Sequence, residues 1–303
     1  MRRIIRITRI GMVINASLAV IKLVVGYLSG SLGLVADGFN SLLDIFTDFI
    51  VVAGATIGAK PADKNHPYGH GKIETFTSVI VDLALMVLGA GIIWSALVAL
   101  QQPAKPVIGK WVIIVSAITF VTKNRLYRIT KRIADEVRSS ALDANSWNHR
   151  TDSYLALLVM GGGISSMLGF PQGDKIAGLV LGLFIITVGA KLMYHALFEL
   201  SEGSPGHETE QQIIDVISSS KDVKGWHKLR IRRIGRELSM DVHILLDQDI
   251  TVKMGHDIVR AIEKEAERQL DWPVNLTIHI DPASPEIIAA RQAVGDPTLR
   301  LED

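Results

Sequence analysis

Two pairs of polar residues with the same spacing interrupt long apolar stretches of this chain. Asn40 and Asp44 form the first pair, and Asn148 and Asp152 form the second. Residues four apart lie one above the other on a helix face, so each pair presents a carboxamide oxygen beside a carboxylate. An aspartate at the centre of a membrane-spanning helix costs about 2.5–3.5 kcal/mol on insertion scales, and such residues usually mark a pathway. The two pairs therefore predict the two halves of one oxygen-rich cation site.

The donor atoms of these pairs indicate which ions the site would accept. Four oxygens with two negative charges can replace part of the hydration shell of a divalent cation. Hard oxygen donors suit Mn²⁺, Mg²⁺ or Fe²⁺, whereas imidazole and thiolate sites favour Zn²⁺ and Cu⁺. His149 is adjacent to Asn148 and three residues before Asp152. A modest rotation of the helix would present its imidazole in place of the amide. Hydrogen bonding between helices is the structural alternative to metal binding.

Two further clusters combine histidine with carboxylate. The first lies in the loop from Pro61 to His70, where proline and glycine bend the chain enough for Asp63, His66 and His70 to converge on one ion. The second lies in the C-terminal third of the chain, where imidazoles and a carboxylate fit Zn²⁺-type coordination. Its members are His227, His243, His256, His279 and Asp281.

Composition indicates a membrane protein. The chain has 303 residues, 48% of them hydrophobic and 21% charged, with a mean hydropathy of +0.29, which is too apolar for a soluble protein unless the apolar residues are collected into spans. The net charge of +1 gives no field that would attract nucleic acid, and the absence of cysteine excludes disulfides and thiolate zinc sites. Six stretches approach the roughly 20 residues that a bilayer requires. They are 8–29, 33–58, 75–100, 107–125, 142–168 and 175–198.

The distribution of basic residues predicts the orientation of these spans. Lysine and arginine concentrate in the N-terminal segment and in the 59–73 and 123–140 connections, whereas the opposite connections hold only Lys105, Lys110 and Lys175. Because positive loops remain in the cytoplasm, both termini are expected there. The basic N-terminus runs into its apolar stretch without a cleavage pattern, which favours an uncleaved first span.

The composition changes after Ser201, where a second domain is expected. Residues 207–220 and 253–270 have helical periodicity, whereas 226–234, 237–246 and 273–280 have strand character. This α-β-β-α-β order predicts a small α+β domain with both helices on one face of a three-stranded sheet. The expected organisation is a transmembrane domain over 1–203, a cytoplasmic domain over 204–284 and a loose polar tail over 285–303.

These features together resemble the cation diffusion facilitator family of divalent-metal exporters over residues 8–284. The motifs that carry the resemblance are SGSLGLVADGFNSLLDIFTD, KPADKNHPYGHGKIE, NHRTDSY and TIHIDP. The resemblance implies six transmembrane helices, a C-terminal ferredoxin-like cytoplasmic domain, a homodimer in the lipid bilayer and metal export coupled to protons. It implies a secondary transporter with no catalytic residue. The compact loops and short tail favour a bacterial inner or plasma membrane.

The resemblance also assigns the candidate ligands. It implies a transport site of Asn40, Asp44, Asn148 and Asp152, a loop site of Asp63, His66 and His70, and a dimer-interface site of His227, His243, His279 and Asp281 with His256 nearby. Zinc-transporting members of the family have the motifs D-x-x-x-D and H-x-x-x-D in the second and fifth helices. This chain has Asn40 and Asn148 at the first positions of these motifs, which favours Mn²⁺ or Fe²⁺ as the transported ion. The cytoplasmic histidines still indicate ions of the Zn²⁺ type. The alternatives are an exporter of Zn²⁺, Cd²⁺ or Co²⁺, or a metal sensor or scaffold that transports nothing.

Overall fold

The computed structural model describes residues 2–102, 109–137, 140–235, 237–270, 272–284 and 300–301. The chain divides into two compact units. The first comprises residues 1–53 and 80–193, and the second comprises residues 54–79 and 194–303. Each unit is described by itself.

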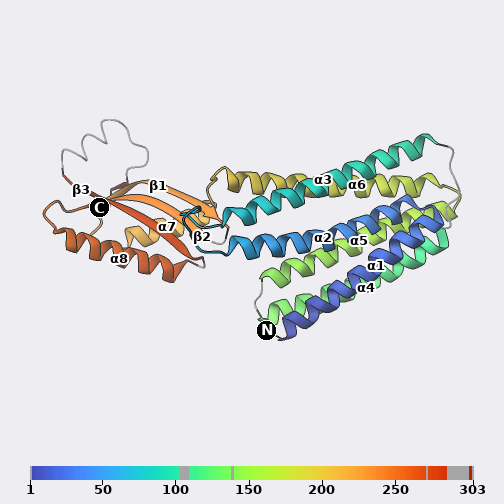
Figure 1. The fold of residues 1–303 in the computed structure, drawn as a ribbon, viewed down its shortest axis with the longest axis horizontal. Helices are drawn as coiled ribbons and strands as arrows, with labels where there is room; N and C mark the ends of the chain where they lie inside the picture. The colour runs from blue at the N-terminus through green and yellow to red at the C-terminus, as the bar shows by residue number, and fades with distance from the viewer. Residues whose placement is uncertain are drawn as a thin grey trace. The chain divides into compact units, whose positions relative to one another are not determined.

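Long helices make up the described N-terminal two thirds of the chain (Figure 1). Their bounds are α1 Arg2–Ser29, α2 Leu32–Gly58, α3 Lys72–Gln101, α4 Gly109–Val137, α5 Ser140–Met167 and α6 Gln172–Leu200. Five of them match the stretches expected from the sequence to within a few residues at most ends. The prediction of a basic loop over 123–140 is wrong, because α4 continues to Val137. Basic and acidic side chains pair one turn apart along this extension, at Lys131–Asp135 and Arg132–Glu136, which favours the helix.

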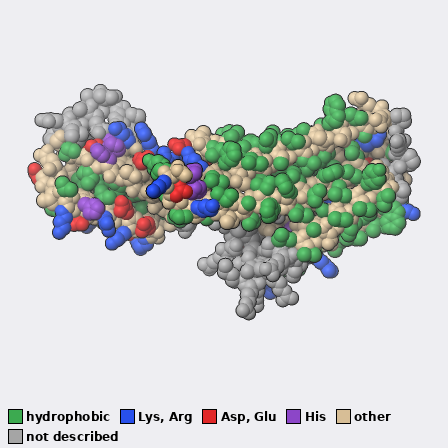
Figure 2. Space-filling model, in the orientation of Figure 1, with side chains coloured by type: hydrophobic (Ala, Val, Ile, Leu, Met, Phe, Trp, Pro, Cys, Tyr) green, Lys and Arg blue, Asp and Glu red, His purple; other side chains and the backbone are tan. Residues whose placement is uncertain are grey.

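Apolar side chains cover the outside of these helices. Val13, Phe49 and Trp94 are 67%, 74% and 71% exposed, and on the face shown in Figure 2 hydrophobic side chains dominate the helical region. Four helices are long and apolar enough to cross a membrane: Gly11–Ser29 within α1, and α2, α3 and α6. Among the described residues, α4 and α5 miss that criterion by composition, because charged and polar residues interrupt their apolar sequence. The count of six spans is therefore not established by hydropathy.

A buried carboxylate fixes the beginning of α2. The Ser31 hydroxyl accepts a hydrogen bond from the Leu34 N–H (3.1 Å) at the N-cap position. Asp174, in the first turn of α6, accepts hydrogen bonds from the Leu32 N–H (2.7 Å) and from the Ser31 hydroxyl (2.5 Å). A negative charge at a helix N-terminus is favourable. This contact ties α2 to α6 and thereby sets the depth of Asn40 and Asp44.

The C-terminal domain is a sheet with helices on one face (Figure 1). Its elements are α7 His207–Ser218, β1 Gly225–Ile234, β2 Glu237–Leu246, α8 Val252–Gln269, β3 Val274–Pro282 and β4 Arg300–Leu301. The strand order is β3-β2-β1-β4, with β2 antiparallel to β1 and parallel to β3. Alternate residues of β2, including Met240 and Val242, pack with Ile213 of α7 and Ile262 of α8 in one core. The residues between these positions, such as Asp241 and His243, therefore point to the opposite face of the sheet.

The chain order α7-β1-β2-α8-β3 is the order expected from the sequence. One feature of the predicted loose tail differs: Arg300–Leu301 forms a short strand paired with Gly225–Trp226 of β1. The other tail residues, 285–299 and 302–303, lie outside the described residues.

Glycines allow α3 and α6 to approach closely, and this contact can be tested. A Cβ atom on Gly89 would lie 2.7 Å from Ile186 Cγ1 and 2.9 Å from the Gly182 carbonyl oxygen. We expect Gly89→Ala to destabilise the detergent-solubilised protein by about 1–3 kcal/mol through overpacking, measured as a lower melting temperature. Gly91→Ala is the control, since no atom lies within 4 Å of its Cβ position and alanine favours a helix. Equal melting of the two variants would contradict a close contact at Gly89.

Candidate metal sites

The predicted transport residues lie near the middle of α2 and α5. Asn40 is 6% exposed, Asp44 is half-buried, and Asp152 is 4% exposed. Asp44 and Asp152 each come 12 residues after the start of their helices, Leu32–Gly58 and Ser140–Met167. Both carboxylates therefore lie far from the helix ends, at the depth where an isolated charge would be costly.

The structure separates the two neighbouring candidates on α5. His149 is 4% exposed, whereas Asn148 is exposed. The His149 ring lies against α1, because a Cβ on Gly11 would be 3.7 Å from Nε2. Its Nδ1 is buried without a hydrogen-bond partner among the described residues, a condition that costs about 1–3 kcal/mol. An imidazole, and not the amide of Asn148, is thus buried on the same helix as Asp152.

Two buried lysines neutralise aspartates inside the helical unit. Lys123 Nζ of α4 lies 2.5 Å from Asp152 Oδ2, and Lys22 Nζ of α1 lies 2.8 Å from Asp37 Oδ2 of α2. Lys22 also donates to the Ser41 hydroxyl at 3.0 Å. Sequence reasoning assigned Lys123 to a cytoplasmic loop and missed its role. The signal that could have found it is its position directly after the apolar run 111–122, within one continuous helix.

The described residues of the helical unit do not form a cluster of three histidine or carboxylate ligands. In the described part of the chain, groups of three histidine or carboxylate side chains with ligand atoms within 4.8 Å of one another occur only in the second unit. They are Asp63, His66 and His70, and His227, His243 and Asp281. Both were expected from the sequence as separate metal sites.

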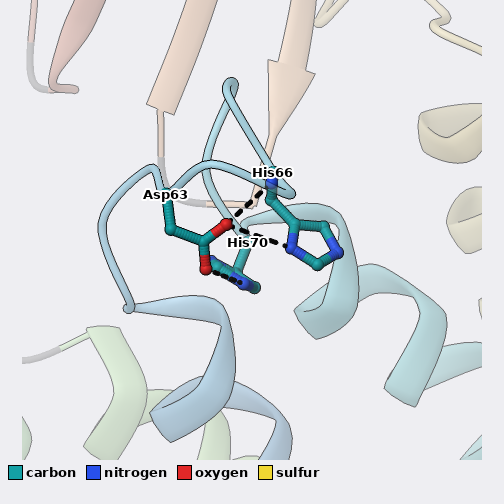
Figure 3. A group of neighbouring side chains, drawn as sticks. All are labelled: Asp63, His66 and His70. Atoms are coloured by element: carbon teal, nitrogen blue, oxygen red, sulfur yellow. Dashed lines mark hydrogen bonds and ion pairs between the residues drawn. The ribbon is translucent and has the colours of Figure 1, made fainter.

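The loop cluster is held by backbone hydrogen bonds to its carboxylate (Figure 3). Asp63 Oδ1 accepts from the N–H groups of Asn65 (2.9 Å) and His66 (2.8 Å). The N–H of His66 is the main cause that lowers the pKa of Asp63 below its ordinary 3.8. His66 Nδ1 and His70 Nε2 each lie 3.5 Å from an Asp63 carboxylate oxygen. The loop therefore offers one carboxylate and two imidazole donors to a single ion.

The same loop packs against the β1–β2 turn of the C-terminal domain. A Cβ on Gly71 would lie 3.0 Å from the Ile234 carbonyl oxygen, and a Cβ on Gly235 would lie 2.9 Å from the Gly71 carbonyl oxygen. Beside this contact, Glu202 accepts from Lys72 (2.8 Å) and Arg232 (3.2 Å). The Lys72 hydrogen bond is the main cause that lowers the pKa of Glu202. These contacts position the loop on the sheet.

A row of histidines crosses the face of the sheet opposite α7 and α8. Strand register places His227 opposite His243, and His243 opposite His279. All three contact Asp281: His227 Nε2 at 3.0 Å, His243 Nδ1 at 3.2 Å and His279 Nε2 at 3.3 Å. Ligand atoms around a tetrahedral Zn²⁺ with bonds of 2.0–2.1 Å are separated by about 3.3 Å. The donor atoms of His227, His243 and Asp281 all lie within 4.8 Å of one another and therefore fit an ion of the Zn²⁺ type, whereas His279 contacts Asp281 and lies outside this group.

His256 does not join this row. It lies on the exposed side of α8, which packs on the opposite face of the sheet through Ile262 and Ala266. The sheet itself separates the His256 imidazole from Asp281. Proximity along the chain to the other histidines could not reveal which face α8 would cover.

Family models match nearly all of the described chain. The cation efflux transmembrane domain matches residues 8–201, and the cation efflux cytoplasmic domain matches residues 205–283. The chain belongs to the cation efflux family. It is the family that the sequence motifs indicated under the name cation diffusion facilitator, and its members are transporters, not enzymes. The helical region is accordingly a transmembrane domain, and the sheet domain is cytoplasmic.

Similar proteins include plant and bacterial members of this family. The chain is 32% identical to metal tolerance protein C1 of Arabidopsis thaliana over 92% of its own length, but it spans only 62% of that relative. It is 28% identical to the manganese efflux system protein MneP of Bacillus subtilis, over 91% of this chain and 95% of that protein. The metal-bound C-terminal domain of the CzcD transporter from Thermotoga maritima is 29% identical over 25% of this chain and 87% of that one, with a TM-score of 0.24.

The histidine row predicts that substitutions of His243 and His256 have different effects on Zn²⁺ binding. We expect His243→Ala to abolish high-affinity Zn²⁺ binding by the cytoplasmic domain, because it removes the central donor beside Asp281. His256→Ala is the matched control and should bind as wild type does. Isothermal titration of the full-length protein in detergent measures both. Loss of binding in the His256 variant would contradict the ligand set derived from the sheet face.

The lowered pKa of Asp63 predicts how loop binding depends on pH. Asp63 is ionised above its ordinary pKa of 3.8 and loses its contribution only as the pH falls through its still lower folded value. Asp63 therefore remains ionised throughout the range from pH 8 to about 5. Asp63→Asn should weaken binding by a constant factor across this window.

Zn²⁺ titrations from pH 5 to 8 in a background with both His243→Ala and Asp152→Ala isolate the loop cluster. Asn65→Ala is the control, because only the backbone N–H of Asn65 contacts Asp63. A loss of affinity in the Asp63→Asn variant that changes between pH 5 and 8 would contradict an Asp63 that stays ionised across this range.

Proposed function

We propose that this protein exports a divalent transition-metal cation from the cytoplasm by alternating access, with protons as the counter-ion. The observation that carries the proposal is the burial of polar residues in the middle of α2 and α5 of a cation efflux transmembrane domain. Apolar packing would not require Asn40 and Asp152 at these positions. Relatives named for metal tolerance and manganese efflux support the same class of cargo.

The transport site in this proposal is formed by Asn40, Asp44, Asp152 and a fourth donor from α5. The burial of His149 supports its imidazole as that donor, and Asn148 is the alternative from the sequence. Three oxygens and at most one imidazole still favour Mn²⁺ or Fe²⁺. An imidazole donor would extend the range toward Zn²⁺, Cd²⁺ and Co²⁺.

Proton coupling follows from the chemistry of the donors. Carboxylates and imidazole bind metal only when they are deprotonated, so protons entering from an acidic exterior compete with the bound ion. This direction requires the site to face the cytoplasm when it loads and the exterior when it releases. The basic residues near the N-terminus and along α4 support cytoplasmic termini.

The cytoplasmic domain is proposed to act in a homodimer. Its family model describes the cytoplasmic domain of cation efflux proteins, and the histidine row lies on the sheet face that α7 and α8 leave uncovered. A Zn²⁺-type ion bound there would stabilise the domain, or its binding would allow the protein to sense metal in the cytoplasm. In the rival function, a sensor that transports nothing, this would be the principal site.

Proteoliposome flux separates transport from sensing. We expect an acidic lumen to drive Mn²⁺ uptake into inside-out vesicles, because protons then leave the vesicle as Mn²⁺ enters. Asp44→Ala and Asp152→Ala should each lower the uptake rate at least about a hundredfold, because each removes a charged donor. His243→Ala should leave the Asp44-dependent flux measurable. Flux indifferent to the pH gradient would contradict antiport, and flux unaffected by Asp44→Ala would favour the sensor.

Competition among metals in the same assay assigns the fourth donor. Wild-type flux should be inhibited by Fe²⁺ more strongly than by Zn²⁺ if oxygen donors dominate. His149→Ala is expected to lower Zn²⁺ competition, whereas Asn148→Ala, at the exposed neighbouring position, should change little. If Asn148→Ala lowers Zn²⁺ competition and His149→Ala does not, Asn148 is the fourth donor.

A further inference from the structure

Two fully buried hydroxyls on α4 lack partners. Ser116 Oγ and Thr119 Oγ1 belong to residues with 0% exposure, and neither atom has a hydrogen-bond partner among the described residues. Each such group left unsatisfied costs about 1–3 kcal/mol. Lys123 follows Thr119 by four residues and Ser116 by seven. All three therefore lie on one face of α4.

That face lies along the seam between α4 and α5. A Cβ on Gly163 would be 3.0 Å from Val112 Cγ1, and Lys123 pairs with Asp152. Both contacts fit one antiparallel register, which places Thr119 level with Ala156 and Ser116 level with Val159. Ala156 and Val159 are 0% exposed and apolar. The neighbouring helix therefore offers these hydroxyls no side-chain partner.

We propose that Lys123 is a two-position counter-cation: its ammonium neutralises Asp152 in the empty transport site and moves to the Thr119 and Ser116 hydroxyls when a divalent cation binds. This inference rests on the proposed function, because it assigns the exchange to the transport site. It adds α4 to the two helices that supply the ligands. Lys123 acts through Asp152 and is a positioning residue.

The geometry favours this movement. Helical side chains lean toward the N-terminus of their helix, so the Lys123 side chain is directed toward the turn that contains Thr119. The Cβ atoms of residues four apart are roughly 6 Å apart, which the long lysine side chain can span. An ammonium carries three donors and no acceptor, and hydroxyl oxygens are suitable acceptors. The unpaired hydroxyls supply in advance the acceptors that a displaced ammonium requires.

Electrostatics explain why displacement would accompany binding. An ammonium 2.5 Å from Asp152 Oδ2 occupies the position where a metal ligand bond would form. A divalent cation attracts the carboxylate more strongly and repels the ammonium at short range. Once displaced, a charged group buried at 1% exposure without a hydrogen-bond partner would be costly. The two hydroxyls lower that cost.

Mn²⁺ binding to the full-length protein in nanodiscs tests the proposal at one fixed pH. Thr119→Val should weaken binding about tenfold, the effect of one hydrogen bond to a charged group, because it removes an acceptor needed only in the loaded state. The melting temperature without metal should stay unchanged or rise, since an unpaired hydroxyl is lost. Thr130→Val, at a 3%-exposed position of the same helix, is the matched control and should change neither quantity.

A double-mutant cycle with Lys123 completes the test. Lys123→Met should tighten Mn²⁺ binding about tenfold, and Thr119→Val should then have no further effect, because the hydroxyl acts only through the ammonium. An equal effect of Thr119→Val with and without Lys123 would overturn the proposal, as would identical behaviour of the Thr119 and Thr130 variants. The comparison of those two variants stands even if Lys123→Met does not fold.

The Asp152→Ala variant separates this inference from the proposed function. If wild-type protein does not bind Mn²⁺ in an Asp152-dependent manner, the transport site itself is contradicted. If it does, and Thr119→Val binds as Thr130→Val does, only the role of Lys123 is overturned.

Discussion

The transmembrane domain depends on neutralising charge inside an apolar bundle. Two lysines, Lys22 and Lys123, are almost completely buried, and each contacts an aspartate of the following helix. Removing two charges from water is repaid only when their geometry is good and further hydrogen bonds are made. Such pairs are therefore a poor means of stabilising a fold. They place a positive charge directly beside a carboxylate in the middle of a membrane protein.

The second unit applies a different constraint, the fixed register of a sheet. Three histidines come from three strands, and pairing places them side by side without any loop to adjust. The Asp63 loop packs on the same domain at the β1–β2 turn, where glycines allow backbone contact. The Lys72–Glu202–Arg232 cluster ties the beginning of α3 to β1. Both candidate metal clusters thus belong to one compact unit.

Sequence reasoning predicted the helices, apart from the end of α4, and the order of helices and strands along the C-terminal domain, because these follow from apolar length and alternation. It failed where a position depends on rotation about a helix axis. At about 100° per residue, Asn148 and His149 lie roughly 40° and 60° to opposite sides of Asp152, so spacing alone could not choose between them. His256 was misplaced for a similar reason, since periodicity does not state which sheet face a helix covers. Lys123 was lost because a run of basic residues was interpreted as a loop.

A resident ammonium also bears on charge selectivity. In the proposed transport site Asp44 and Asp152 would contribute two negative charges, and Lys123 already pairs with Asp152. A monovalent cation that displaced it would exchange one unit charge for another and gain little Coulomb energy, while still losing its hydration shell. A divalent cation gains about twice the attraction from the same carboxylate. Oxygen donors alone do not exclude Na⁺ or K⁺, but oxygen donors that already hold an ammonium favour ions of higher charge.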